Sequence, residues 1–349
     1  MPTHKVLVVR NDKLGDFMLA WPAFALLKTS LPDCRIDALV PEYTRPLAVN
    51  CPWIDRVVVD PAEDPRGSAL TRTLSDNAYD AIVTLFSTSR VGLAAWRAGI
   101  PVRIAPATKL AQIFYNQRLT QRRSRSEKPE FAYNVDLVKH LLNLWNRLPK
   151  PPAAPPYLQF GSEQIAAARA DLLAQHGFDY HARLVFIHAG SGGSARNLSI
   201  PQYATLATRL ASNDGNVFVL CAGPGELSRA RELAASIAGC AHVVFDSREG
   251  LVNYARRIAF ADLFISGSTG PLHIAGALNR PTAAFYPRRQ SSTALRWQTI
   301  NDASRRLAFS PSPHADDHDM SAIDLDRAAA AIIKIQRFLS SFKRTFGTS

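Results

Sequence analysis

The sequence lacks the features that mark secreted, membrane-spanning and disulfide-stabilised proteins. Its 349 residues include only four cysteines, and no two of them have CxxC spacing. Such cysteines are typical of small buried hydrophobic side chains in a reducing compartment. No apolar run approaches the length of a transmembrane helix. The early run at 6–9 ends at once in charged residues, which argues against a signal peptide. We therefore expect a cytoplasmic protein.

Acidic residues are also scarce. Lys and Arg number 41 against 29 Asp and Glu, a formal net charge of +12, which favours nucleic acid, anionic lipid headgroups or phosphorylated glycans as partners. Interleaved surface aromatic residues and any recognisable nucleic-acid module are missing, so we expect no nucleic-acid partner. The basic excess gathers in segment 118–128, at Arg118, Arg122, Arg123 and Arg125. We expect this segment to contact the acceptor of a reaction or, peripherally, an anionic membrane surface; a solvated loop is the alternative.

What the sequence does contain is an alternation of strand-like and helix-like segments. Short β-branched runs at 5–10, 35–40, 56–60 and 80–86 are separated by stretches with helical apolar spacing. This alternation is typical of a parallel sheet that helices cover on both faces.

Prolines interrupt the alternation at 148–157, and the same pattern restarts after them. We interpret this stretch as a domain boundary, because closely spaced prolines favour extended linkers; a surface loop within one domain is the alternative. The predicted class is α/β, with Rossmann-like doubly wound domains at 1–155 and 156–323 facing a central cleft. A C-terminal amphipathic helix within 324–349 is expected to pack back on the first domain.

Residues 265–278 read ISGSTGPLHIAGAL, with small polar residues between a strand-like and a helix-like run. Pro271 suits the first turn of a helix, and Thr269 or Gly270 can cap it. The start of a helix offers N–H groups and a positive dipole end, and glycine lets an anion approach the backbone. The segment therefore predicts a phosphate cradle, with an ordinary strand-to-helix turn as the alternative. Ligands of open parallel sheets bind at such strand ends.

Three stretches, VVRNDKLGDFMLAWPAFALLK, HAGSGGSARN and DLFISGSTGPLHIAGALN, resemble glycosyltransferase family 9, the ADP-heptose:lipopolysaccharide heptosyltransferases. The resemblance covers nearly the whole chain. It implies the GT-B fold and an inverting, metal-independent transfer, with no cofactor beyond the ADP-sugar donor. It also implies that the N-terminal domain binds a lipopolysaccharide core or other anionic glycan acceptor, and that the C-terminal domain binds the nucleotide-sugar.

The resemblance places Asp16 at the position of the catalytic aspartate of the family, so we expect it to act as general base. A carboxylate directly before an apolar run can instead cap the helix that follows. For the leaving diphosphate, the expected donors are Ser268, Thr269, Gly270 and His273. A histidine packed in the core is the alternative for His273.

The turn at 190–197 supplies the remaining phosphate contacts that we expect, Ser191, Ser194 and Arg196. Family members often carry a lysine here, followed by Trp-Pro, so a plain surface arginine is the alternative for Arg196. We expect Gly223, Gly225 and Glu226 to bind the nucleoside, unless Glu226 only caps the next helix.

Many family members carry an aspartate where this chain has Ser268. A GT-B glycosyltransferase that uses another nucleotide-sugar, for a different glycan or a protein, is therefore the alternative function. The acidic and histidine-rich segment 314–319 suggests a metal site, but without a second ligand cluster we expect a polar loop and no metal.

Overall fold

The computed structural model describes residues 4–108, 110–151, 153–190, 196–212 and 215–346. The chain divides into two compact units, Met1–Tyr157 and Leu158–Ser349, called here the N-terminal and C-terminal units. The division falls at the end of the proline-rich stretch, two residues after the expected boundary.

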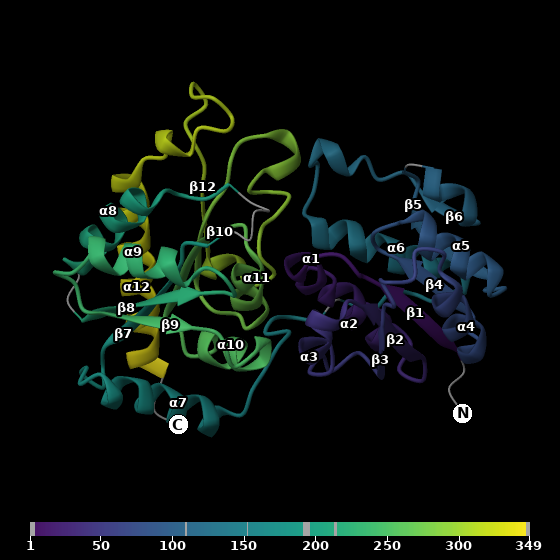
Figure 1. The fold of residues 1–349 in the computed structure, drawn as a ribbon, viewed down its shortest axis with the longest axis horizontal. Helices are drawn as coiled ribbons and strands as arrows, with labels where there is room; N and C mark the ends of the chain where they lie inside the picture. Colours follow the sequence, from purple (N-terminus) through teal and green to yellow (C-terminus); the bar gives the residue numbers. More distant parts are fainter. Residues whose placement is uncertain (1–3, 109, 152, 191–195, 213–214, 347–349) are drawn as a thin grey trace. The chain divides into compact units, whose positions relative to one another are not determined.

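Each unit is built around a six-stranded parallel sheet in the residues described (Figure 1). In the N-terminal unit the strand order is β3-β2-β1-β4-β5-β6. The strands are β1 (Lys5–Val9), β2 (Arg35–Val40), β3 (Arg56–Val59), β4 (Ala81–Thr84), β5 (Val102–Pro106) and β6 (Gln117–Leu119). Val8 of β1 pairs with Ala38 of β2 and Val83 of β4, so β1 lies at the centre. Four of its five residues are buried, which is why it reads as a continuous apolar run.

Helices cover both faces of this sheet. They are α1 (Leu14–Met18), α2 (Trp21–Ser30), α3 (Arg45–Ala48), α4 (Ser68–Asn77), α5 (Ser89–Arg97) and α6 (Glu130–Leu144), with short 3₁₀ turns η1 (Glu42–Thr44), η2 (Leu110–Phe114) and η3 (Arg123–Arg125). One hydrophobic cluster joins Leu7 and Ile82 of the sheet to Leu70 of α4 and Val91 of α5. Helices α2 and α6 pack against each other.

The C-terminal unit repeats the plan with the order β12-β11-β10-β7-β8-β9. Its strands are β7 (Arg183–His188), β8 (Asn216–Ala222), β9 (His242–Asp246), β10 (Leu263–Gly267), β11 (Thr282–Phe285) and β12 (Arg306–Phe309). Its helices are α7 (Ser162–Gln175), α8 (Ile200–Ala211), α9 (Leu227–Ser236), α10 (Leu251–Ile258), α11 (Gly270–Ala277) and α12 (Leu325–Phe346), with 3₁₀ turns η4 (Gln290–Ser292), η5 (Ala303–Arg305) and η6 (Met320–Ala322). Counted within each unit, both sheets have the order 3-2-1-4-5-6. The second and third strands lie on one side of the first strand, and the fourth to sixth strands lie on its other side, so the topology switches between the first and fourth strands. Ligands bind at that switch point.

The C-terminal helix α12 packs on helix α8 of its own unit. Ala328 and Ile332 of α12 are fully buried in the hydrophobic cluster of the C-terminal unit, with Leu206 and Leu210 of α8. These Ala and Ile positions of α12 match the apolar face of α8, so α12 packs on the sheet-covering layer of its own unit. The expectation that it also contacts the first domain stays a prediction.

Candidate functional site

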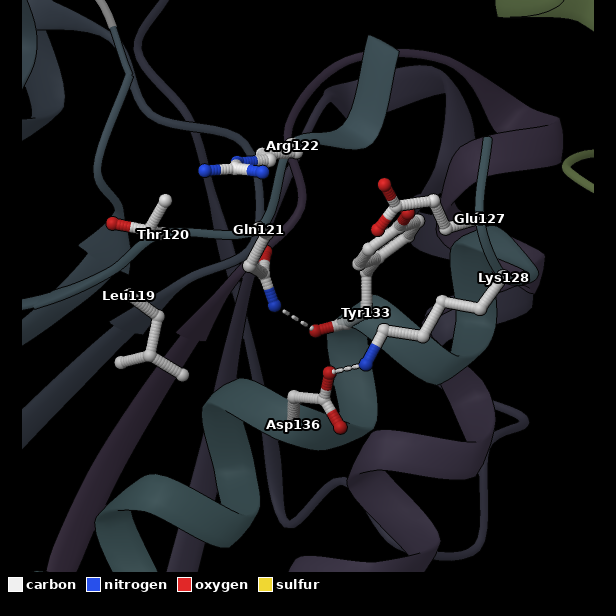
Figure 2. Close-up of a pocket in the computed structure, with 8 residues that line it drawn as sticks. All are labelled: Leu119, Thr120, Gln121, Arg122, Glu127, Lys128, Tyr133 and Asp136. Atoms are coloured by element: carbon white, nitrogen blue, oxygen red, sulfur yellow. Dashed lines mark hydrogen bonds and ion pairs between the residues drawn. The ribbon is translucent and has the colours of Figure 1, made fainter. Parts of the chain in front are cut away.

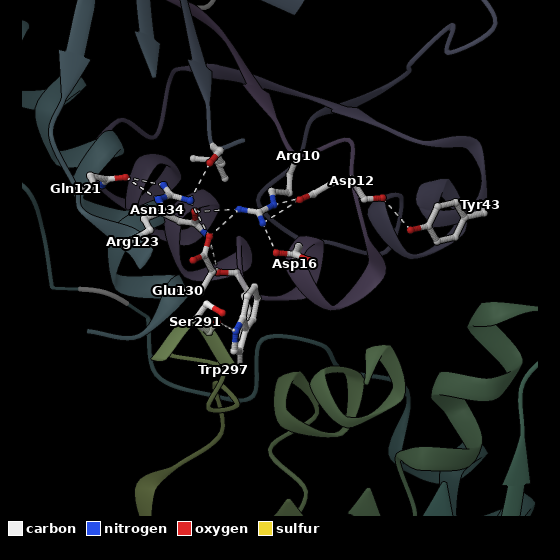
Figure 3. Close-up of polar contacts among 12 residues, drawn as sticks. Arg10, Asp12, Asp16, Tyr43, Gln121, Arg123, Glu130, Asn134, Ser291 and Trp297 are labelled. Atoms are coloured by element: carbon white, nitrogen blue, oxygen red, sulfur yellow. Dashed lines mark hydrogen bonds and ion pairs between the residues drawn. The ribbon is translucent and has the colours of Figure 1, made fainter. Parts of the chain in front are cut away.

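The switch point of the N-terminal unit carries a cluster of charged side chains, called here the Arg10 cluster (Figure 3). Arg10 directly follows β1, and only 2 % of its side chain is exposed. Its Nε and Nη2 donate to the two oxygens of Asp12 at 2.8 and 3.0 Å, and its Nη1 donates to Glu130 at 3.1 Å and Asn134 at 3.3 Å. Nη2 also pairs with Asp16 Oδ1. These contacts use the whole donor fork of the guanidinium and fix its position.

Asp16 lies inside α1, in its first turn, rather than at its N-cap, which is Lys13. Its carboxylate pairs with Arg10 instead of a free helix N–H, so the capping alternative is not the arrangement observed. Burial raises the pKa of Asp16 to about 6, opposed by Arg10 and reinforced by Asp12 and Glu130. A carboxylate with that pKa is ionised at neutral pH and can accept a proton.

Glu130, at the start of α6, connects the Arg10 cluster to the basic segment. Its buried Oε1 also accepts a 2.7 Å bond from Arg123 Nη1. Arg123 donates further to the Leu85 carbonyl at 2.9 Å and to Gln121 Oε1. Of the four arginines that the sequence groups together, Arg118, Arg122 and Arg125 are exposed, whereas Arg123 lies inside the unit. Its inward position was not foreseen, since Glu130 is distant from any recognised motif.

A cavity of about 330 Å³ lies beside this connection, after the end of β6 (Figure 2). Its lining consists of Leu119, Thr120, Gln121, Arg122, Glu127, Lys128, Tyr133 and Asp136. Gln121 Nε2 donates to the Tyr133 carbonyl at 2.7 Å, and Lys128 pairs with Asp136. The backbone of Arg122 is left-handed, with φ of 40°. Residues other than glycine seldom adopt this conformation, and it occurs at functional turns. The mixed polar and aromatic lining suits a hydroxylated ligand.

The switch point of the C-terminal unit carries little charge. Thr269 is the N-cap of α11, and Pro271 occupies its first turn, as the sequence predicts. The Thr269 side chain makes no capping bond. Its hydroxyl lies 3.0 Å from that of Ser266, which donates to the His188 carbonyl at 2.9 Å. Gly270 N–H begins the helix, where no intrahelical acceptor exists, while the Thr269 N–H already donates to Gly267 O.

His273, one turn into α11, is buried, and no partner of its Nδ1 is found among the residues described. Burial lowers its pKa to about 4, so the ring is neutral at pH 7. His273 is therefore packed in the core, as the alternative interpretation expects. A buried ring nitrogen without a hydrogen-bond partner nevertheless costs folding free energy. Ser268 is partly exposed on the same turn.

Asn197 lies between the chain just after β7 and the end of β10. Its Nδ2 donates to the carbonyls of Ala189 and Gly190 at 3.1 and 2.9 Å. A Cβ on Gly267 would lie 2.6 Å from Asn197 Oδ1 and 3.3 Å from the carbonyl oxygen of Arg196. Glycine at 267 therefore permits the turn to approach, and Arg196 is brought beside it with an exposed side chain. Ser191 and Ser194 lie outside the described residues.

Glu226 lies between the chain segments that follow β7 and β8 in this unit. It occupies the N-cap position of α9, but its side chain does not cap that helix. The carboxylate accepts a 3.1 Å bond from the Gly223 N–H. A Cβ on Gly190 would lie 2.1 Å from Glu226 Cδ, so the carboxylate fills the space that glycine leaves. Gly225, with φ of 79°, shapes the intervening turn.

The sequence did not predict two residues that lie near Glu226, His188 and Tyr254. His188 Nε2, at the end of β7, lies 3.5 Å from Glu226 Oε2, and the Tyr254 hydroxyl lies 3.4 Å from His188 Nδ1. Burial lowers the pKa of His188, against the attraction of Glu226. The position of His188 directly before the glycine-rich turn was the available signal; Tyr254, within α10, offered none.

Among the described residues, no group of three or more His, Cys, Asp and Glu side chains could hold a metal ion. In the segment 314–319, Asp316 and Asp319 accept bonds from the backbone N–H groups of His318 and Ser321. Within the part of the chain that the structure describes, no helix is long and apolar enough to cross a bilayer.

Comparison with known proteins bears on both sites. The profile of glycosyltransferase family 9 (heptosyltransferase) matches residues 68–320. A Haemophilus influenzae protein named "Putative glycosyltransferase" is 46 % identical over 333 residues, which cover 94 % of this chain and 96 % of that protein. Lipopolysaccharide heptosyltransferase 2 of Escherichia coli K12 is 23 % identical, over 81 % of this chain and 82 % of its own. The solved structure of E. coli ADP-heptose lps heptosyltransferase II superposes with a TM-score of 0.76 at 20 % identity, covering 96 % of this chain and 99 % of that one.

Proposed function

This chain belongs to glycosyltransferase family 9, and we propose that it transfers heptose from ADP-heptose to a lipopolysaccharide core acceptor, with inversion and without a metal. It is a glycosyltransferase with the GT-B fold of two Rossmann-like units. One observation carries the proposal: the N-terminal unit has a largely buried carboxylate with a raised pKa at its switch point, and the C-terminal unit has the N-terminus of α11 at the equivalent point. Glycosyl transfer needs a base for the acceptor and a counterpart for the leaving diphosphate.

Asp16 is the base in this mechanism. The acceptor hydroxyl oxygen forms a bond to the anomeric carbon while the bond from that carbon to the diphosphate oxygen breaks. Asp16 takes the hydroxyl proton, and the electron pair of the broken bond leaves with ADP. Attack on the face opposite the leaving group inverts the anomeric configuration. Arg10 contacts Asp16 at Oδ1, so we assign proton transfer to Oδ2.

Arg10 and Glu130 position the base. Arg10 is fixed by Asp12, Asn134 and Glu130, so the Asp16 carboxylate meets a rigid partner rather than a mobile one. Burial, with the nearby carboxylates of Asp12 and Glu130, keeps the pKa of Asp16 high enough for proton transfer near neutrality, against the opposing effect of Arg10.

Backbone groups and a few side chains hold the diphosphate. We assign this role to the Gly270 N–H and the positive end of α11, with the hydroxyls of Ser268 and Thr269 and the neutral ring of His273. Arg196 adds a cation from the neighbouring turn, and Ser191 and Ser194 are proposed to join it. Gly223, Gly225 and Glu226 take the nucleoside, with the Glu226 carboxylate accepting hydrogen bonds from the ribose hydroxyls.

The acceptor is proposed to bind on the N-terminal unit. Exposed Arg122 and Arg125 suit the phosphate and carboxylate groups of a lipopolysaccharide core or other anionic glycan, and the cavity beside Arg122 suits a sugar ring. We propose a cytoplasmic location, consistent with free cysteines at 34, 51, 221 and 240.

Ser268 motivates a second candidate. It is partly exposed on the phosphate turn and brings no carboxylate to it, so a donor with another sugar is the alternative, acting on a different glycan or a protein. Thermal shifts with ADP-heptose and with other nucleotide-sugars distinguish the two, because a ligand stabilises only the state that binds it.

Product analysis with ADP-heptose and a truncated core lipid tests the main proposal. A heptosylated product of inverted configuration, formed in the presence of a metal chelator, is the expected result. Transfer only from a different nucleotide-sugar would contradict the proposal that ADP-heptose is the donor. Transfer only with added metal would contradict the metal-free mechanism.

A further inference from the structure

A long segment of the N-terminal unit carries charge of one sign. Residues 81–126 contain no Asp or Glu and eight Lys or Arg. Arg90 pairs with Asp60 and Arg123 with Glu130, both from outside the segment. Arg97 and Arg118 are exposed. The segment itself therefore offers no carboxylate to offset the exposed Arg97 and Arg118.

Large apolar side chains are exposed on the same segment. The exposed fractions are 56 % for Trp96 on α5, and 84 % and 68 % for Leu110 and Ile113 on η2. Leu110 and Ile113 are three residues apart in a 3₁₀ turn, so their side chains lie on the same side. Isolated exposed leucines need no explanation, but a group of them marks a contact surface.

The two elements that carry these side chains are packed together. A Cβ on Gly92 of α5 would lie 2.9 Å from the Tyr115 ring and 3.0 Å from Phe114 Cβ, so glycine lets α5 approach the end of η2. Trp96 is one helical turn after Gly92, on the same side of α5. Figure 1 shows α5 near β5 and β6 at one edge of the N-terminal unit. Trp96, Leu110, Ile113, Arg97 and Arg118 define what we call the α5–η2 face.

We propose that the α5–η2 face docks on an anionic lipid bilayer. Trp96, Leu110 and Ile113 enter the interfacial layer, and Arg97 and Arg118 contact lipid phosphates. A tryptophan and aliphatic side chains beside arginines are the combination that this layer favours. A glycan offers no apolar layer for Leu110 and Ile113, and a protein partner would need an acidic rim around an apolar centre. The inference goes beyond the proposed reaction and holds for any donor sugar.

Vesicle flotation of the full chain tests the proposal. We use vesicles of phosphatidylcholine alone and of phosphatidylcholine with phosphatidylglycerol, at low and high salt. Binding is expected only with phosphatidylglycerol, with release by salt. The double variant Leu110→Ser/Ile113→Ser is expected to bind about tenfold more weakly, since insertion removes part of the apolar area from water.

Leu148→Ser is the matched control, because Leu148 is 90 % exposed in the same unit but outside the face. It should bind vesicles as the unchanged chain does. All variants should keep the melting temperature and the transfer rate to a soluble, truncated acceptor, which separates this surface from the catalytic machinery. The proposal is wrong if the unchanged chain fails to bind anionic vesicles or binds neutral ones equally. It is also wrong if the double variant binds normally or if Leu148→Ser loses as much.

Trp96 provides an independent readout. Its indole fluorescence should shift to shorter wavelength with anionic vesicles, and Trp96→Phe should abolish most of the shift. A shift that survives this substitution would place the contact elsewhere on the molecule.

Discussion

In the N-terminal unit the segment after the first strand carries Arg10, Asp12 and Asp16, whereas in the C-terminal unit the equivalent strand ends in His188 and a turn of glycines. The sheets have the same strand order. The first switch point is built from several paired charges around Arg10, and the second from backbone groups, a neutral imidazole and the single carboxylate of Glu226. A shared scaffold can thus carry different chemistry at the same position, and we propose that the first site takes up a proton and the second holds an anion.

The largest expected effect comes from removing the carboxylate of Asp16, which tests whether the charged switch point supplies the base. We expect Asp16→Asn to lower kcat by about 10³-fold, since general-base catalysis contributes about 10²–10⁴-fold. The measurement is the initial transfer rate at saturating donor and acceptor.

Asp12→Asn is the matched control, because it removes a carboxylate on the same guanidinium that is not assigned to the proton. Its loss of kcat should be much smaller. Equal losses, with both variants folded, would mean that the charge of the cluster matters and that Asp16 is not the base.

The second test concerns stability of the charged switch point. Glu130→Gln leaves Arg10 and Arg123 with less compensating charge in a buried setting. We expect the free energy of unfolding to fall by about 3 kcal/mol, measured by denaturant titration.

Glu63→Gln, at an exposed position of the same unit, should change that free energy by less than about 0.5 kcal/mol. If Glu130→Gln were equally mild, the buried pairs would not hold the Arg10 cluster together.

The third test addresses the switch point of the C-terminal unit. A methyl group at position 190 would overlap the Glu226 carboxylate, so Gly190→Ala should displace it and raise the KM for the donor about tenfold, the cost of a hydrogen bond to a charged group. Gly239→Ala is the control, because a Cβ there meets nothing within 4 Å. A normal donor KM in Gly190→Ala would remove Glu226 from the nucleoside site.

The smallest expected effect is a shift along the pH axis. Asp16 accepts a proton only when ionised, so the rate should fall as pH drops through about 6, the raised pKa of Asp16. Glu130 contributes to raising that pKa, so Glu130→Gln should move the acidic limb to lower pH. A limb that stays in place would assign the titration to another group.

Sequence reasoning reached the parts of this molecule that depend on local pattern. The repeated strands, the proline break and the helix start at Thr269 and Pro271 follow from apolar period and from proline geometry. The edge strands β6 and β12 went unpredicted, because three- and four-residue strands with arginines have no clear alternation. Residues 17–31 have helical apolar spacing throughout, but the chain breaks there between α1 and α2.

The candidate sites divide in the same way. Asp16 and the turn at 266–270 lie within the motifs that resemble the family, so sequence reasoning could propose roles for them, and those roles stay predictions. Glu130 and Tyr254 meet Arg10 and His188 only through contacts over 120 and 66 residues. Contacts of that separation depend on the packing of α6 and α10 on their sheets, which no local spacing encodes.

The most direct test of the account is a crystal structure with bound ADP-heptose. The account predicts that the diphosphate lies within hydrogen-bond distance of the Gly270 N–H and the His273 ring, with the ribose on Glu226. A diphosphate bound instead at the Arg10 cluster, or in the cavity beside Arg122, would contradict it.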